Sequence, residues 1–252
     1  MLVFFYIICI IIKNKDNQGI EMNRKKQISQ LKIFENVSAK TKETLLQVGS
    51  IQEVPKGTFL IRAREAVSTI FFQLAGKSVI YNLTHSGKRK ILFVLGPGEL
   101  LNEHVLNNCP ASMYCETIDQ STVLAIPVSE FIKLMAEDFE FAKSILEAQE
   151  KKMWRLSHQL KNTASCIYLE RKLAAKLWKL SRDFGIRKED GIEIDINMTI
   201  TFLADMLGVP RETTSRACSV LMENGLIKIH KKRITITDPV KMSLFFKVGK
   251  IE

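Results

Sequence analysis

The spacing of apolar residues changes along the chain and predicts where helices and strands lie. Apolar positions at steps of three and four favour a helix within residues 28–51. A period of two follows, in short runs rich in Val, Ile and Phe that are separated by turns containing glycine and proline. These runs are residues 58–61, 69–74, 78–83, 90–95 and 122–126. Strands at this spacing predict a compact antiparallel barrel or roll.

Helical spacing returns at residue 129 and holds to about residue 163, with a break at Asp138. The second part carries a mostly apolar seam whose steps are typical of a two-stranded coil. The seam comprises Ile145, Gln149, Met153, Leu156 and Leu160. Such a seam packs either on a second copy of the chain or on the chain's own β-region, and its spacing alone leaves both alternatives open.

Residues 199–238 predict two short helices followed by a basic hairpin. Gly208 falls where the chain must bend between the helices, and Pro210 suits the first turn of the second one. The side of the second helix away from its apolar residues carries Arg211, Glu212, Ser215, Arg216 and Ser219. Arginine can bridge guanine O6 and N7, glutamate can accept from the cytosine amino group, and serine can reach a base or a phosphate. We therefore predict base reading by Arg211, Glu212, Ser215 and Arg216, with a merely solvated helix face as the alternative.

Composition supports a nucleic-acid partner and indicates no enzyme. A net charge of +10 over 252 residues suits a polyanion, although membrane surfaces and RNA also attract basic proteins. Five cysteines without a CxxC pair indicate a reducing, intracellular setting, and we expect a cytoplasmic protein. The four histidines lack metal-ligand spacing, and GxSxG, HExxH and Walker patterns are absent. We accordingly predict no catalytic residue and no metal site.

The first 21 residues form a separate apolar extension. Residues 1–12 (MLVFFYIICIII) are too few to span a bilayer and lack the basic flank of a secretory signal. Three interpretations remain: a start-site artefact with translation from Met22, a monotopic membrane anchor, or a buried N-terminal strand or helix. We favour the artefact, because Met22 begins a typical cytoplasmic opening (MNRKKQISQL).

Residues 211–216 (RETTSR) resemble the recognition helix of the Crp/Fnr family of bacterial transcription regulators. This run satisfies both the R-E-x-x-x-R pattern of the cyclic-AMP receptor protein and the E-x-x-S-R pattern of Fnr. Residues 56–60 (KGTFL), 72–76 (FQLAG) and 96–101 (GPGELL) resemble the family's cyclic-nucleotide-binding β-roll. The resemblance implies an α+β fold with an N-terminal antiparallel β-roll (a double-stranded β-helix), a long dimerisation helix and a C-terminal winged helix-turn-helix. The expected boundaries are 1–21 for the extension, 22–128 for the effector-sensing β-roll, 129–163 for the dimerisation helix and 164–252 for the DNA-binding domain.

The same resemblance assigns further contacts. It makes the seam at Ile145, Gln149, Met153, Leu156 and Leu160 a homodimer interface, with a hinge at residues 162–165. Two recognition helices would then lie about one DNA turn apart on an inverted repeat. The predicted contacts to the DNA backbone are Thr201, Thr213, Thr214, Ser219, Lys231, Lys232 and Arg233. Double-stranded DNA, a second copy of the chain, an unknown small-molecule or redox effector and RNA polymerase are the expected partners.

The effector pocket departs from the pattern of cyclic-AMP binders. Glu103 matches the glutamate that binds the ribose, but Met113 stands where the arginine for the cyclic phosphate is expected. A phosphate without that arginine lacks charge-assisted pairing, which argues against cyclic AMP. The predicted pocket comprises Leu100, Glu103, His104, Met113 and Tyr114. His104 falls near the haem-ligating histidine of the family's carbon-monoxide sensors, so haem-based gas sensing is one alternative, and the cofactor is unknown. The alternative from another class is a membrane-associated or protein-binding signalling module that uses the β-roll as an interaction domain.

Overall fold

The computed structural model describes residues 28–29, 31–106, 109–164 and 168–249. The chain divides into two compact units, one made of Met1–Ile80 with Phe93–Met153 and the other of Tyr81–Leu92 with Trp154–Glu252. Within the described ranges, no helix combines the length and apolarity that a membrane span requires. The N-terminal extension lies outside these ranges, and the domain boundaries expected from the sequence stay predictions.

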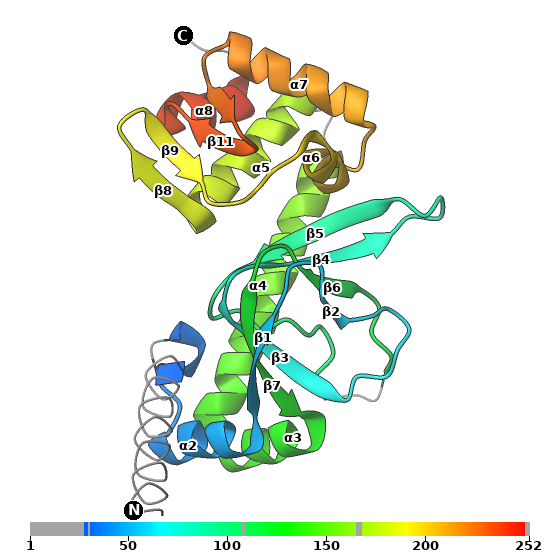
Figure 1. The fold of residues 1–252 in the computed structure, drawn as a ribbon, viewed down its shortest axis with the longest axis vertical. Coiled ribbons are helices and arrows are strands. Elements are labelled where there is room, and N and C mark those ends of the chain that lie inside the picture. The colour runs from blue at the N-terminus through cyan, green and yellow to red at the C-terminus, as the bar shows by residue number, and fades with distance from the viewer. Residues whose placement is uncertain (1–27, 30, 107–108, 165–167, 250–252) are drawn as a thin grey trace, which may run out of the picture. The chain divides into compact units, whose positions relative to one another are not determined.

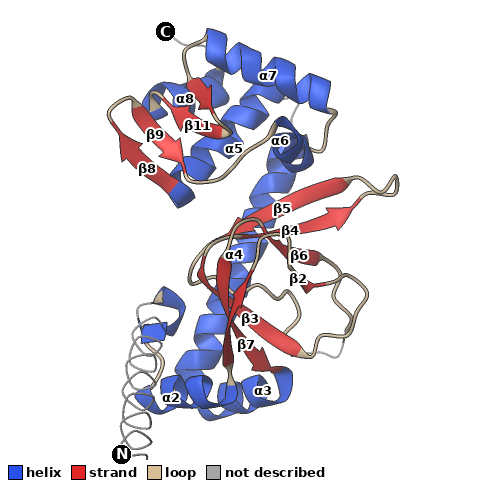
Figure 2. Ribbon diagram, viewed as in Figure 1, coloured by secondary structure: helices blue, strands red, loops and turns tan. Residues whose placement is uncertain are grey.

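Two antiparallel sheets form the β-roll (Figures 1 and 2). The three-stranded sheet has the order β1-β7-β3, from Ser50–Val54, Ser121–Pro127 and Thr69–Ala75. The four-stranded sheet has the order β2-β6-β4-β5, from Phe59–Ile61, Tyr114–Thr117, Ser78–Leu83 and Arg89–Leu95. The antiparallel roll expected from the two-residue period is therefore confirmed.

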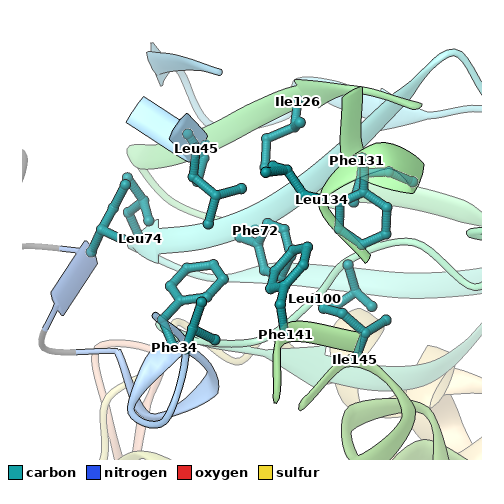
Figure 3. Packing of buried hydrophobic residues seen from close by; sticks show 14 residues of the cluster. Phe34, Leu45, Phe72, Leu74, Leu100, Ile126, Phe131, Leu134, Phe141 and Ile145 are labelled. Carbon is teal, nitrogen blue, oxygen red and sulfur yellow. The ribbon is translucent and has the colours of Figure 1, made fainter. Parts of the chain in front are cut away.

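Helices cover the three-stranded sheet and enclose an aromatic core. A 3₁₀ turn η1 (Lys32–Phe34) and α2 (Ala39–Val48) precede the strands, and α3 (Val128–Glu137) and α4 (Phe139–Ala164) follow them. In Figure 3 the rings of Phe34, Phe72, Phe131 and Phe141 lie in one cluster. The ring centroids of Phe34 and Phe72 are 5.1 Å apart, a spacing at which aromatic pairs attract one another.

The C-terminal part of the second unit, from residue 168 onward, is a winged helix-turn-helix. It contains α5 (Leu169–Phe184), α6 (Ile200–Leu207), α7 (Arg211–Glu223) and α8 (Pro239–Val248). Its four-stranded antiparallel sheet has the order β10-β11-β9-β8, from Ile227–His230, Arg233–Ile236, Gly191–Ile194 and Gly185–Lys188. Helix α5 packs against α7 and α8 and carries the buried Leu173, Leu177 and Leu180.

Four elements differ from the sequence-based expectation. Strand β1 begins at Ser50, where helical spacing had been expected to continue to residue 51. Strand β6 has only four residues and buries Cys115 and the polar Thr117, so it shows no apolar period in the sequence, and β8 is exposed throughout. Helix α8 was missed although Asp238 caps it, accepting from the backbone N–H groups of Val240 and Lys241. The Asp-Pro pair at its start was the signal that could have found it.

Candidate functional site

The turn between α6 and α7 sets the geometry of the helix pair. The Thr199 hydroxyl caps α6 by accepting from the N–H of Phe202 at 3.1 Å. Gly208 ends α6 in the left-handed region, with φ 75°, and its N–H donates to the Ala204 carbonyl at 2.7 Å. Glycine enters this region without the steric cost that a Cβ imposes. Pro210 then precedes α7, as its position in the sequence suggested.

Helix α7 has one buried face and one exposed face. The buried face comprises Thr214, Ala217, Cys218 and Leu221. Arg211, Glu212, Ser215 and Arg216 are all exposed on the other face. Within the described ranges, none of these four side chains has a hydrogen bond or an ion pair with another residue. Two guanidinium groups, a carboxylate and a hydroxyl are thus free to bind an external partner.

The residues of α6 and α7 that were predicted to contact the DNA backbone differ in their exposure. Thr201 and Thr213 are exposed, and Ser219 is half-buried. Thr214 is completely buried, and its hydroxyl donates to the Pro210 carbonyl at 3.0 Å. Helical spacing had placed Thr214 beside Thr213, but packing turns it inward, so its assignment to the DNA backbone is corrected.

The hairpin β10–β11 forms the wing. Its tip residues Lys231 and Lys232 are exposed and have positive φ values of 45° and 68°. The Arg233 guanidinium lies 2.5 Å from the Asp195 carboxylate and is only partly exposed. Lys231 and Lys232 therefore present their charges outward, whereas Arg233 also ties the wing to the chain that precedes α6.

In the β-roll, the Glu103 carboxylate is held by the loop at residues 112–113. It accepts from the backbone N–H and the hydroxyl of Ser112, the latter at 2.9 Å, and from the Met113 N–H at 3.0 Å. His104 Nε2 lies 3.9 Å from Glu103 Oε1. The structure thus brings together three of the predicted pocket residues, Glu103, His104 and Met113.

The other two predicted pocket residues lie differently. Leu100 is 1% exposed and belongs to the aromatic core, so its assignment to the pocket is corrected. Tyr114 is half-buried, and its ring stands edge-on to Phe59 with the centroids 6.3 Å apart. A buried core position and a pocket wall share the same apolar character in sequence, which explains the error at Leu100.

Asn102 is a structural residue that the sequence analysis missed. Its side chain is 1% exposed, accepts from the Phe71 N–H at 2.7 Å and donates to the Thr69 carbonyl at 2.9 Å. Its backbone carbonyl accepts from Lys152 Nζ of α4 at 2.8 Å. Asn102 thereby joins β3 to α4. No local sequence pattern identifies such a residue, because all of its partners are distant in the chain.

The α4 seam divides between the protomer core and the surface. Ile145 is completely buried among the core residues, and Gln149 donates to the carbonyls of Asn102 and Glu103. Ile145 is corrected as an interface residue, because it is buried inside the protomer, whereas Gln149 is half-buried and its place at the interface stays a prediction. Leu156 is half-buried, whereas Met153 and Leu160 are 65% and 70% exposed. The exposed apolar side chains of α4 are instead Phe139, Leu146, Met153, Trp154 and Leu160.

The two thiols of the β-roll, at Cys109 and Cys115, lie in different environments. Burial raises the pKa of Cys115 to about 12, against smaller opposing effects of Lys152 and Ser78, so its thiol stays protonated near neutral pH. Cys109, by contrast, is exposed. Among the described residues, no group of three or more His, Cys, Asp or Glu side chains is arranged to hold a metal ion.

Comparisons with known proteins agree with both halves of this description. Residues 51–138 match the model of the cyclic nucleotide-binding domain, and residues 171–244 match the Crp-like helix-turn-helix domain. The global nitrogen regulator of Synechococcus elongatus is 33% identical over 124 residues, covering 49% of this chain and 55% of that protein. The probable transcriptional regulator flp of Lacticaseibacillus casei is 27% identical over 218 residues, covering 84% of this chain and 94% of that protein. The chain thus spans about half of the first relative and nearly all of the second.

Solved structures share the fold. A crp/fnr-family transcriptional regulator of Eubacterium rectale superposes with a TM-score of 0.68 at 17% identity, covering 86% of this chain and 98% of that one. FixK2 of Bradyrhizobium japonicum superposes with a TM-score of 0.67 at 18% identity, covering 78% of this chain and 96% of that one. At these identities the likeness concerns the fold alone.

A β-roll followed by a long helix and a winged helix-turn-helix defines a class of DNA-binding transcription regulators, which are not enzymes. The matches to both domain families and to named regulators identify the family within this class. The chain belongs to the Crp/Fnr family of transcriptional regulators.

Proposed function

We propose that two copies of the chain bind an inverted-repeat operator, each reading one half-site through α7. The observation that carries the proposal is the free polar face of α7, with Arg211, Glu212, Ser215 and Arg216 exposed and without partners among the described residues. Their donors and acceptors match those of base edges in the major groove. The family patterns in residues 211–216 favour a half-site containing TTGA first and TGTGA second.

The wing supplies contacts that position the protein without reading sequence. Lys231 and Lys232 project from the hairpin tip, where each ammonium group can pair with a phosphate. Thr201, Thr213 and Ser219 are the further candidates for phosphate contacts. Because Arg233 already pairs with Asp195, we assign it chiefly to fixing the wing.

Homodimerisation through α4 would bring the two reading helices together. Leu146, Met153 and Leu160 recur at seven-residue steps on this helix and are 55%, 65% and 70% exposed. Seven-residue apolar spacing is that of a two-stranded coiled coil. A symmetric pair would therefore bury a stripe that a single copy leaves in water.

We further propose that the β-roll senses an effector other than cyclic AMP. Met113 offers no charge for a phosphate, and Glu103 already accepts from the donors of residues 112–113. RNA polymerase is a further candidate partner, as expected for a regulator that acts at promoters.

The experiment is selection of bound sequences from a random pool of duplex DNA, with the chain alone and with added cell extract. An enriched inverted repeat with half-sites about one helical turn apart is the expected result. Enrichment of single half-sites would contradict the dimeric arrangement. If neither condition enriched any sequence, the proposal of a sequence-specific reader would be rejected.

A further inference from the structure

Three donors from the loop at residues 112–113 converge on the carboxylate of Glu103. The successive N–H groups of Ser112 and Met113 point to one oxygen, Oε1, and the Ser112 hydroxyl reaches Oε2 at 2.9 Å. Successive backbone N–H groups that face one point make a concave site for an anion. In this chain the anion in that site is a side chain of the protein itself.

The surroundings of this carboxylate leave little support for a second negative charge. The Glu103 side chain is only 15% exposed. In the described part of the chain, His104 is the one basic group within 4.0 Å of it, with Nε2 at 3.9 Å. A phosphate entering here would meet a carboxylate instead of an arginine, and like charges at close range repel. An external anion would therefore have to displace Glu103 before it reached the loop donors.

The backbone of the same residue is fixed to α4. Gln149 Nε2 donates to the Glu103 carbonyl at 3.1 Å and to the Asn102 carbonyl at 3.3 Å. Lys152 Nζ donates to the Asn102 carbonyl at 2.8 Å. Glu103 thus holds the loop with its side chain and holds α4 with its main chain, so it joins the two without any added molecule.

We infer that Glu103 is an internal anion that fills the anion position of the β-roll and keeps the loop at residues 112–113 attached to α4 without a phosphate-bearing effector. It follows that the chain binds its DNA site without an anionic ligand, and that any effector is neutral or cationic. This inference rests on the proposed function only where DNA binding is the readout.

The first test removes the carboxylate and restores it from solution. In the full chain, Glu103→Ala should make the amides of Ser112 and Met113 exchange hydrogen for deuterium about tenfold faster or more, because each loses a bond to a charged acceptor. Added acetate should slow that exchange again, since it supplies a carboxylate to the emptied site. Excess cyclic AMP should leave exchange in the unaltered chain unchanged.

A matched control is available in the same region. Glu99 also accepts from a backbone N–H, that of Gly96 at 2.9 Å, and it is similarly shielded. Glu99→Ala should leave exchange at residues 112–113 unchanged and should show no response to acetate there. Unaltered exchange in Glu103→Ala, or the same acetate response in both variants, would overturn the inference.

The second test uses DNA binding. The chain is unfolded, freed of small molecules and refolded, and is then expected to bind its selected DNA site without a cyclic nucleotide or any other anion from the extract. Glu103→Ala should weaken that binding several-fold, and acetate should restore it. If the refolded, unaltered chain bound only after addition of a cyclic nucleotide, or of the anionic fraction of the extract, binding without an anionic ligand would be refuted.

The failure of the proposed function can be distinguished from the failure of the inference about Glu103. If no DNA site is selected at all, the proposed function fails, while the exchange measurement still decides the role of Glu103. If Glu103→Ala does not fold, Glu103→Gln retains the shape and one acceptor oxygen but loses the charge. It should show a smaller acceleration of exchange in the same two amides, and no acceleration would count against the inference.

Discussion

At the scale of single residues, function depends on side chains that stay free on one face while their neighbours are buried. On α7, Arg216 is exposed between the buried Thr214 and Ala217. On the wing, Lys231 is exposed at a turn with positive φ. In the proposed function Arg216 contacts base edges and Lys231 contacts the phosphate backbone, so their loss should have different consequences.

Arg216→Ala should weaken binding to the selected site by about 1–3 kcal/mol and relax preference at one base position. Lys231→Ala should weaken binding to all sequences alike and reduce the slope of log affinity against log salt concentration by about 0.9. Titration of specific and random duplexes at several salt concentrations separates the two effects. An equal loss on both duplexes for Arg216→Ala would contradict its role in base reading.

Asp138 gives the fold an acid-sensitive contact. Burial is the largest single effect on its pKa and raises it, but the hydrogen bonds from Thr41, Ser38 and Phe141 together outweigh burial and lower the pKa from 3.8 to about 2. The ionised carboxylate therefore stabilises the folded chain at pH values above 3.8, and this stabilisation disappears as the pH falls through about 2. We expect the difference in unfolding free energy between the unaltered chain and Asp138→Asn to shrink over that range.

Urea unfolding at a series of acidic pH values measures this difference. Thr41→Val is a matched variant, because it removes the shortest hydrogen bond, 2.6 Å, and leaves the carboxylate in place. It should lose only part of the acid dependence. Identical pH dependence in Asp138→Asn and the unaltered chain would show that Asp138 does not link protonation to folding.

At the scale of elements, one face of α4 packs on the β-roll and another face exposes apolar side chains. One face belongs to the β-roll, through buried Ile145 and through the hydrogen bonds of Gln149 and Lys152 to the carbonyls of residues 102–103. The other face exposes Leu146, Met153 and Leu160. The seam expected from sequence mixed these faces, because positions 145 and 146 are adjacent and both are apolar.

Leu160→Glu should raise the dissociation constant of the homodimer at least about tenfold, because two carboxylates would face each other across the two-fold axis. The unfolding of the protomer should change little, since Leu160 is 70% exposed. Sedimentation equilibrium measures the effect. Val240→Glu is the control, because Val240 is 78% exposed on α8 and lies off the stripe. The same dissociation constant in both variants would exclude this stripe as the interface.

At the scale of the whole molecule, the proposed two-fold symmetry would act together with the charge of the chain. The chain carries a net charge of +10, which favours encounter with DNA of any sequence. Under the proposed function, specificity comes from two half-sites that are read at once, since each α7 presents a single short polar face. The spacing between half-sites is consequently a property of the dimer.

Inserting about five base pairs between the half-sites should reduce affinity to that of a single half-site, because the second site turns to the opposite side of the duplex. Inserting about ten base pairs should restore part of the lost affinity, because the second half-site returns to the same side of the duplex. The recovery should be incomplete, because the dimer must then span a longer distance. Gel-shift titrations of the three duplexes test this. Equal affinity for all three would mean that each copy binds independently.

The sequence by itself determined the order and kind of the main elements. Alternation of apolar residues marked β3, β4, β5 and β7, and the motif in residues 211–216 marked the reading helix. These signals are local, because apolar periodicity and turn residues follow from the geometry of a single helix or strand. Short or weakly patterned elements, such as β6 and β8, lacked enough residues to show a period.

Only the tertiary structure decided which of two similar residues is buried and which is free. In the structure Thr214 and Leu100 are buried. Ile145 is buried as well, whereas its neighbour Leu146 is exposed. The tertiary structure also joined Asn102 to β3 and α4, and closed the loop donors of residues 112–113 on Glu103. The physical reason is that these outcomes depend on contacts between residues far apart in the chain, where hydrogen bonds and close packing select one partner among several of the same chemical type.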